Sequence, residues 1–230
     1  MGTSIPKWEN KTKRYVAFLD ILGFKDYVLR HRIDEVYSRL NTLHELSPDE
    51  IESGPKYKKS IKERVRISIF SDSVCVFSIN DEYLSLFYFL SYLKTILRRA
   101  LRKGVPLKGA VAYGDLVVDN DSNIFCGQPI IDAYLLEEDL QYLGVVFHHT
   151  FEKPFSELST ANMNKIRKWL REVETPFKYG KRIHFNLDYR LSGDTVFDMT
   201  KHIIKQRSFS SGDSRKYIDN TLQMISSFDK

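Results

Sequence analysis

The sequence predicts an α+β fold: an antiparallel sheet that carries helices on one face, followed by a mostly helical C-terminal extension. Apolar periodicities occur in the order strand, helix, hairpin, helix, hairpin, helix, strand, which is typical of this class. The strongest helix signal covers residues 82–103, where leucine, isoleucine and phenylalanine form one broad apolar face. Beyond residue 150 the alternation ends, so we place a first domain at 1–150 and the extension at 151–230.

The other elements follow from local patterns. In the first half, a buried strand, a helix, a polar loop around Gly54 and Pro55 and a hairpin are predicted at residues 14–20, 24–46, 47–64 and 65–77. A second hairpin, a helix with proline in its first turn and a short strand follow at 107–126, 129–140 and 145–147. In the extension, three helices and one strand are predicted at 159–173, 194–206, 214–227 and 182–187.

Composition places the chain among ordinary globular proteins. Its 230 residues are 42% apolar and 28% charged, enough to bury a sizeable core. No apolar stretch reaches the roughly 18–20 residues of a membrane span, and the N-terminus lacks the apolar core of a signal peptide. Both cysteines, Cys75 and Cys126, lie in apolar strand-like runs. We therefore expect free thiols, a cytoplasmic location and no membrane partner.

The net charge of +5 is unevenly distributed. A basic run over residues 94–103 ends a predicted helix, where cations complement the helix dipole. A second run, residues 56–66, leads into the first hairpin. This second run could attract a nucleoside triphosphate or an RNA backbone.

Two carboxylates stand at the ends of apolar runs. Asp20 closes the first strand, and Asp72 lies at the tip of the first hairpin. If these strands are neighbours in one sheet, both carboxylates can bind a divalent metal, and oxygen ligands of this kind suit Mg²⁺ or Mn²⁺. Asp20 could instead cap a helix, and Asp72 could stabilise its own turn. Together they favour a phosphoryl-transfer enzyme.

Four segments in register resemble the class III nucleotidyl cyclase catalytic domain. They are Phe-Leu-Asp-Ile-Leu-Gly-Phe, Phe-Ser-Asp, Lys-Gly-Ala-Val-Ala-Tyr-Gly and Gly-Gln-Pro-Ile-Ile-Asp-Ala-Tyr-Leu-Leu-Glu, at residues 18–24, 70–72, 108–114 and 127–137. The resemblance covers roughly residues 14–150. It implies a ferredoxin-like, palm-type sheet and two divalent ions, Mn²⁺ or Mg²⁺, at each site.

The chain departs from this family where the purine is bound. Ile131 and Leu135 stand where the family has an asparagine and an arginine, Ile124 replaces its adenine-selecting aspartate, and Arg66 replaces its purine-selecting lysine. This profile resembles the pyrimidine cyclases of bacterial Pycsar antiphage defence. The resemblance implies conversion of UTP to 3′,5′-cyclic UMP and pyrophosphate, with the product detected by a separate effector protein.

The resemblance also implies roles for individual residues. Asp20, Asp72 and the carbonyl of Ile21 would bind the metal ions. Further substrate contacts are expected from Leu22, Gly23, Phe24, Tyr57, Arg66, Ser71 and Lys108. The active form would be a homodimer, with Asp20 and Asp72 from one protomer and residues 107–137 from the other.

Other functions stay open at this point. A cytidylate cyclase would make cyclic CMP, and a purine cyclase would use shifted base contacts. A catalytically silent nucleotide- or RNA-binding domain is the alternative outside enzymes, although no nucleic-acid partner is expected for a cyclase.

Overall fold

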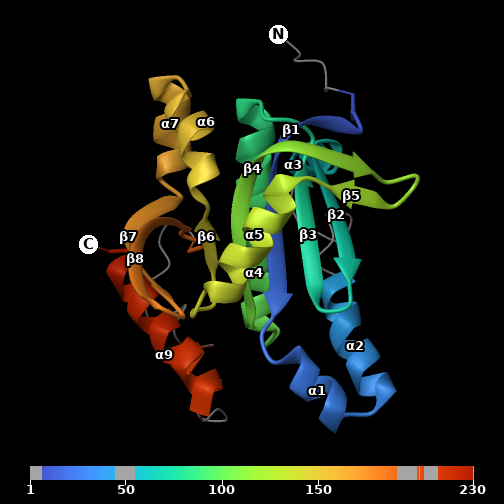
Figure 1. The fold of residues 1–230 in the computed structure, drawn as a ribbon, viewed down its shortest axis with the longest axis vertical. Coiled ribbons are helices and arrows are strands. Elements are labelled where there is room, and N and C mark those ends of the chain that lie inside the picture. Colours follow the sequence, from blue (N-terminus) through green and yellow to red (C-terminus); the bar gives the residue numbers. More distant parts are fainter. Residues whose placement is uncertain (1–6, 45–54, 191–200, 202, 205–211, 230) are drawn as a thin grey trace.

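The protein is described here from a computed structural model, which covers residues 7–44, 55–190, 201, 203–204 and 212–229. Its centre is an eight-stranded sheet in the order β2-β3-β1-β4-β6-β8-β7, with β5 paired to β4 outside that path (Figure 1). The strands are β1 (Lys11–Ile21), β2 (Val65–Phe70), β3 (Ser73–Ser78), β4 (Leu107–Asp119), β5 (Ile124–Cys126), β6 (Val145–Phe147), β7 (Leu170–Phe177) and β8 (Gly180–Leu187). The α+β class is confirmed.

The described helices lie between these strands and after the last of them. They are α1 (Phe24–Arg30), α2 (Ile33–His44), α3 (Pro55–Arg64), α4 (Tyr83–Arg102), α5 (Gln128–Asp139), η1 (His149–Phe151), α6 (Glu152–Ser156), α7 (Thr160–Arg167) and α9 (Gly212–Ser227). Within the described part of the chain, none of them combines the length and apolar character needed to cross a membrane.

Strand β1 is the central strand of the part of the sheet that residues 1–150 form. It pairs antiparallel with β3 on one side and with β4 on the other. In this register Asp20 lies opposite Ser73 on β3 and opposite Lys108 on β4. Strand β4 then pairs in parallel with β6. The end of β1 is therefore flanked by the β2–β3 hairpin tip and by the start of β4.

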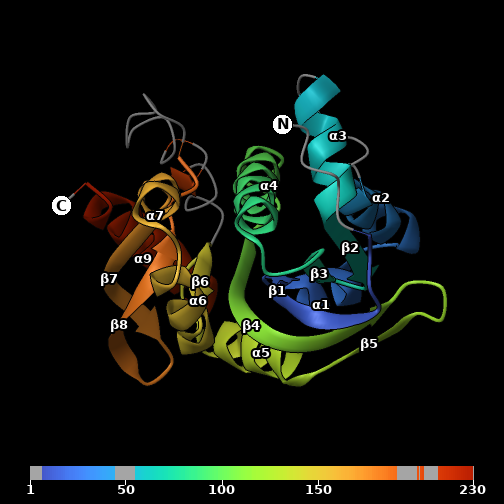
Figure 2. The ribbon, with the colours of Figure 1, turned by 90° about the horizontal axis from the view of Figure 1, so that it is seen from above.

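Helices cover both faces of the sheet, which corrects the prediction of helices on one face (Figure 2). Tyr15 and Leu19 of β1 belong to the main core together with the apolar face of α4. Val16, on the opposite face of the strand, packs in a second cluster with Ala133 of α5. Because successive side chains of a strand point to opposite faces, β1 contributes to both layers.

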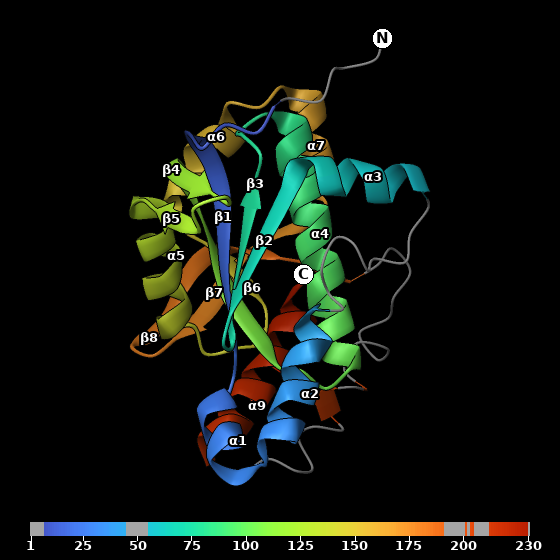
Figure 3. The ribbon, with the colours of Figure 1, turned by 90° about the vertical axis from the view of Figure 1, so that its right-hand side faces the viewer.

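Two helical segments differ from the prediction. The helix expected at 24–46 is interrupted after α1, because His31 adopts an extended conformation (φ −124°, ψ 156°). Figure 3 shows α1 and α2 as separate helices beyond the end of β1. The polar loop predicted before the first hairpin contains helix α3 over its last ten residues, which is anchored by the fully buried Ile61. Residues 45–54 of that loop lie outside the described residues.

The extension continues the sheet. Strands β7 and β8 form an antiparallel hairpin, and Val146 of β6 pairs with Asn186 of β8. The helix expected at 159–173 ends after Arg167, and β7 occupies the rest of that segment. The prediction of a mostly helical extension therefore missed one strand. Most of the helix predicted at 194–206 falls outside the described residues.

Candidate active site

The fold brings the two predicted carboxylate segments together. The N–H of Ile21, directly after Asp20, donates a 3.3 Å hydrogen bond to the carbonyl of Asp72. The carboxylates of Asp20 and Asp72 also repel one another electrostatically, which raises the pKa of Asp20. Both side chains are partly exposed. The two segments that carry the predicted carboxylates therefore lie side by side in one chain.

The hairpin tip is conformationally constrained. Ser71 has φ 55°, in the left-handed region that side chains other than glycine rarely adopt. This backbone directs the chain from β2 into Asp72 and then into β3. Ser71 is exposed beside the carboxylate, in the position where a substrate contact was predicted.

A buried ion pair lies next to Asp20. Lys108 Nζ is 2.6 Å from Glu137 Oε1 and donates a 2.8 Å hydrogen bond to the Glu137 carbonyl. The two residues are 6% and 3% exposed. Glu137 was not predicted as a site residue. Its signal in the sequence is the i, i+4 spacing of Pro129, Ala133 and Glu137, which form the buried stripe of α5.

The electrostatics of Asp20 reflect this surrounding. Burial is the largest cause, followed by the charges of Glu137 and Asp72, and together they raise the pKa of Asp20 to about 7. Lys108 and a hydrogen bond from the Ile21 N–H act in the opposite direction. Burial also raises the pKa of Glu137, while Lys108 lowers it. The charge of Lys108 therefore offsets only part of what raises the pKa of Asp20.

The turn between β1 and α1 carries the predicted phosphate contacts. Gly23 has φ 76°, a conformation that glycine adopts without strain, and it caps α1. The Leu22 N–H donates to the carbonyl of Pro106 at 2.9 Å, so phosphate contacts in this turn would come from Gly23 and Phe24. Phe24 itself is buried and anchors the helix.

Arg66 is not brought to the carboxylates. It lies near the far end of β2, where it pairs with Phe77 rather than with the hairpin tip. Its guanidinium donates to the Lys62 carbonyl at 2.6 Å and lies 5.2 Å from the ring of Trp8. Tyr57 is part of α3, and its side chain lies outside what the structure describes.

The positions that depart from the family pattern face outward. Ile131 and Leu135, which share one stripe of α5, are 51% and 52% exposed, and Ile124 of β5 is 52% exposed. These apolar side chains therefore stand at the surface of their own chain.

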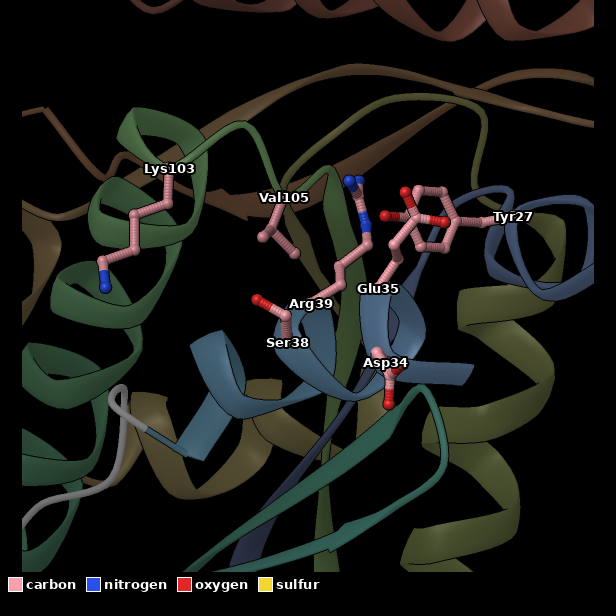
Figure 4. Close-up of a pocket in the computed structure, with 7 residues that line it drawn as sticks. All are labelled: Tyr27, Asp34, Glu35, Ser38, Arg39, Lys103 and Val105. Atoms are coloured by element: carbon pink, nitrogen blue, oxygen red, sulfur yellow. The ribbon is translucent and has the colours of Figure 1, made fainter. Parts of the chain in front are cut away.

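A separate open cavity of about 450 Å³ lies between α1, α2 and the loop before β4 (Figure 4). Its lining comes from α1, α2 and the loop before β4: Tyr27, Asp34, Glu35, Ser38, Arg39, Lys103 and Val105. The guanidinium carbon of Arg39 lies 4.6 Å from the centroid of the Tyr27 ring. Neither Asp20 nor Asp72 lines this cavity, so it is distinct from the candidate site.

The residues present fit a divalent cation. Asp20 and Asp72 supply hard oxygen donors. Burial first, and then the charges of Glu137 and Asp72, raise the pKa of Asp20, and a bound cation would favour its ionised form. Among the described residues, no three His, Cys, Asp or Glu side chains form a ready-made cluster.

Comparison with known proteins identifies the fold. No protein-family model and no curated protein matches the chain. The catalytic core of a rhodopsin-guanylyl cyclase with converted specificity, solved with ATPαS, matches at TM-score 0.50 and 12% identity, covering 77% of this chain and 96% of that one. A bacterial light-regulated adenylyl cyclase gives TM-score 0.48 and 14% identity over 86% and 99% of the two chains.

A class III adenylyl cyclase-like ATP-binding protein from Pseudomonas aeruginosa gives TM-score 0.41 and 15% identity, over 84% of this chain and 40% of that chain. At 12% identity, the guanylyl cyclase core shares a fold with this chain and nothing more specific. The chain thus has a class III cyclase-like fold.

Proposed function

We propose that the chain is a nucleotidyl cyclase that converts a pyrimidine nucleoside triphosphate, UTP before CTP, to its 3′,5′-cyclic monophosphate and pyrophosphate. One observation carries this proposal: Asp20 and Asp72 are tied together by the Ile21–Asp72 hydrogen bond, on a class III cyclase-like sheet. Lys108 lies across β4 from Asp20.

Each residue has a role in this reaction. Asp20, Asp72 and the Ile21 carbonyl would hold Mn²⁺ or Mg²⁺, two ions per site. When bound, such ions activate the ribose 3′-oxygen and neutralise the triphosphate. Gly23 and Phe24 donate their N–H groups to the phosphates, and Lys108 places a positive charge near the leaving pyrophosphate. Phosphoryl transfer needs positioning and charge neutralisation more than covalent help.

The pyrimidine preference is supported by the loss of polar partners for a purine. Ile124 cannot accept a hydrogen bond from a base, and Ile131 and Leu135 offer none either. A purine edge left without partners would cost about 1–3 kcal/mol per buried polar group. Since Arg66 is engaged with Lys62 and Trp8, the preference depends on these apolar positions rather than on Arg66.

We propose a homodimer as the active form. Ile131, Leu135 and the 84%-exposed Phe70 at the hairpin are large apolar side chains uncovered in one chain, and a second copy related by a two-fold axis would cover them. Lys108 already lies beside Asp20 of its own chain. We therefore expect the partner protomer to contribute only β5 and the exposed stripe of α5 to the active site. As the resemblance to the Pycsar pyrimidine cyclases implies, the cyclic nucleotide would be detected by a separate effector protein in antiphage defence.

Incubation of the protein with Mn²⁺ and equimolar ATP, GTP, CTP and UTP tests the proposal, with products identified by mass. Cyclic UMP is expected as the main product. Dominant cyclic CMP would change the preferred substrate alone, whereas dominant cyclic AMP or cyclic GMP would overturn the pyrimidine assignment. Nucleotide binding without any turnover would favour a silent binding domain.

A further inference from the structure

Helix α9 of the extension packs on the turn that follows α5. Asn220 Nδ2 donates to the Gln141 carbonyl at 2.7 Å, and the Leu143 N–H donates to the Thr221 hydroxyl at 2.8 Å. Gln141 Nε2 donates to the Tyr217 hydroxyl at 2.8 Å. Gln141 and Thr221 are buried, so separating helix and turn would leave polar groups without partners. This docking therefore fixes α9 firmly against residues 141–143.

The same tyrosine reaches the candidate active site. Lys108 Nζ lies 5.9 Å from the centroid of the Tyr217 ring, within the range of a cation–π contact. The ammonium is held on another side by the carboxylate and the carbonyl of Glu137. The ring of Tyr217 thus contacts Lys108. Its hydroxyl contacts Gln141, in the turn four residues after Glu137.

We infer that Tyr217 is a positioning residue, through which the C-terminal helix α9 sets the place of Lys108 in the candidate active site. The inference rests on the proposed function, because it assigns a route by which the extension acts on triphosphate binding. A lysine side chain has many rotamers and a strongly hydrated head. A ring that closes its buried surroundings restricts the rotamers that the ammonium adopts.

The experiment compares Tyr217→Leu with Tyr217→Phe, which keeps the ring and loses only the hydroxyl. Met224→Ala is the matched control, because Met224 belongs to the apolar cluster of α9 with Leu140 and Tyr142. For each full-length variant we would measure kcat and KM with the nucleotide converted fastest. Calorimetry with pyrophosphate and Mn²⁺ gives a binding constant that does not depend on turnover, and urea unfolding reports stability.

Tyr217→Leu should raise KM and the Kd of pyrophosphate about two- to thirtyfold, the change that corresponds to losing a cation–π contact of about 0.5–2 kcal/mol, with a much smaller change in kcat. Tyr217→Phe should stay close to wild type in both. Met224→Ala should lower stability and leave KM unchanged.

The outcomes separate this inference from the proposed function. If the wild-type protein converts nucleotide and Tyr217→Leu shows unchanged KM and Kd, the positioning role is overturned and the cyclase assignment stands. An equal rise of KM in Met224→Ala would reduce Tyr217 to a structural residue. Weaker pyrophosphate binding in Tyr217→Leu, in a protein that converts no nucleotide, would support the positioning role while the proposed function fails.

Discussion

The N–H of Ile21 donates a hydrogen bond to the carbonyl of Asp72, so the end of β1 is joined to the β2–β3 hairpin tip by main-chain atoms. Such a contact does not depend on either carboxylate side chain. Substitutions of Asp20 or Asp72 therefore test chemistry without removing the contact that assembles the two segments.

Asp20→Asn and Asp72→Asn should each lower turnover at least about 100-fold, because each removes a charged metal ligand while keeping the size of the side chain. Circular dichroism and urea unfolding should show a native fold in both. Asp121→Asn, in the exposed turn between β4 and β5, serves as a charge-matched control with wild-type turnover. A variant that keeps a tenth of wild-type activity with Mn²⁺ contradicts the assignment.

The stability of the metal-free protein should depend on pH through Asp20. The pKa of Asp20 is about 7 in the folded chain, above its usual value near 4 in an unfolded chain. The folded state thus holds this proton more tightly, and the resulting stabilisation is complete below pH 4 and lost as pH rises through 7.

In urea unfolding, wild type should lose at least about 1.4 kcal/mol relative to Asp20→Asn between pH 4 and pH 8, the value of one pKa unit. Mn²⁺ should restore much of this loss in wild type alone. Parallel pH profiles of the two proteins would show that Asp20 titrates normally.

Removing one partner of the Lys108–Glu137 pair should destabilise the fold strongly. Lys108→Met leaves the Glu137 carboxyl buried without its counter-charge, at a cost of about 3 kcal/mol. The double variant Lys108→Met with Glu137→Leu should recover most of that loss, since no buried charge remains. Urea unfolding of the two single variants and the double variant measures the coupling. Additive losses would mean that the pair is not coupled.

The left-handed conformation of Ser71 should make glycine favourable there. Ser71→Gly should raise the free energy of unfolding by up to about 1 kcal/mol, and Ser71→Val should lower it by about 1–2 kcal/mol. Ser73→Gly, in the extended part of the same hairpin, is the control and should destabilise. A stability loss in Ser71→Gly equal to that of Ser73→Gly would refute the strain at the tip.

The exposed stripe of α5 should be required for dimerisation. Leu135→Glu places a charge on the apolar stripe and should convert the dimer to an inactive monomer in sedimentation velocity. Tyr179→Glu changes an 85%-exposed residue at the β7–β8 turn and should leave the dimer intact. Full activity of a monomeric wild type at assay concentration would rule out the shared site.

The segments around Asp20 and Asp72 could be predicted from sequence because a short-range pattern specifies them: an apolar run, a carboxylate and a turn residue. The placement of α5 could not, because its buried stripe consists of Pro129, Ala133 and Glu137 while Ile131 and Leu135 are exposed. Periodicity alone assigns large apolar residues to the core, which is wrong for these two.

Contacts between residues far apart in the chain could not be predicted from the sequence either. Lys108 and Glu137 meet across 29 positions, and no local pattern pairs a strand lysine with a helix glutamate. The prediction of a helix through residue 173 was wrong because β7 is stabilised by its pairing with β8 along its whole length. Tertiary pairing of that kind overrides local helix preference.

The pairing of β6 with β8 has a consequence for how the chain can be shortened. A fragment ending at residue 150 would leave β6 as an open edge, with its outer N–H and C=O groups free to join another chain. It would also remove the side-chain oxygen of Asn186 on β8, which accepts a 2.8 Å hydrogen bond from the Tyr142 hydroxyl. Recombinant fragments cut at this boundary should therefore aggregate, because the β7–β8 hairpin that covers the β6 edge in the full chain protects the strands against self-association.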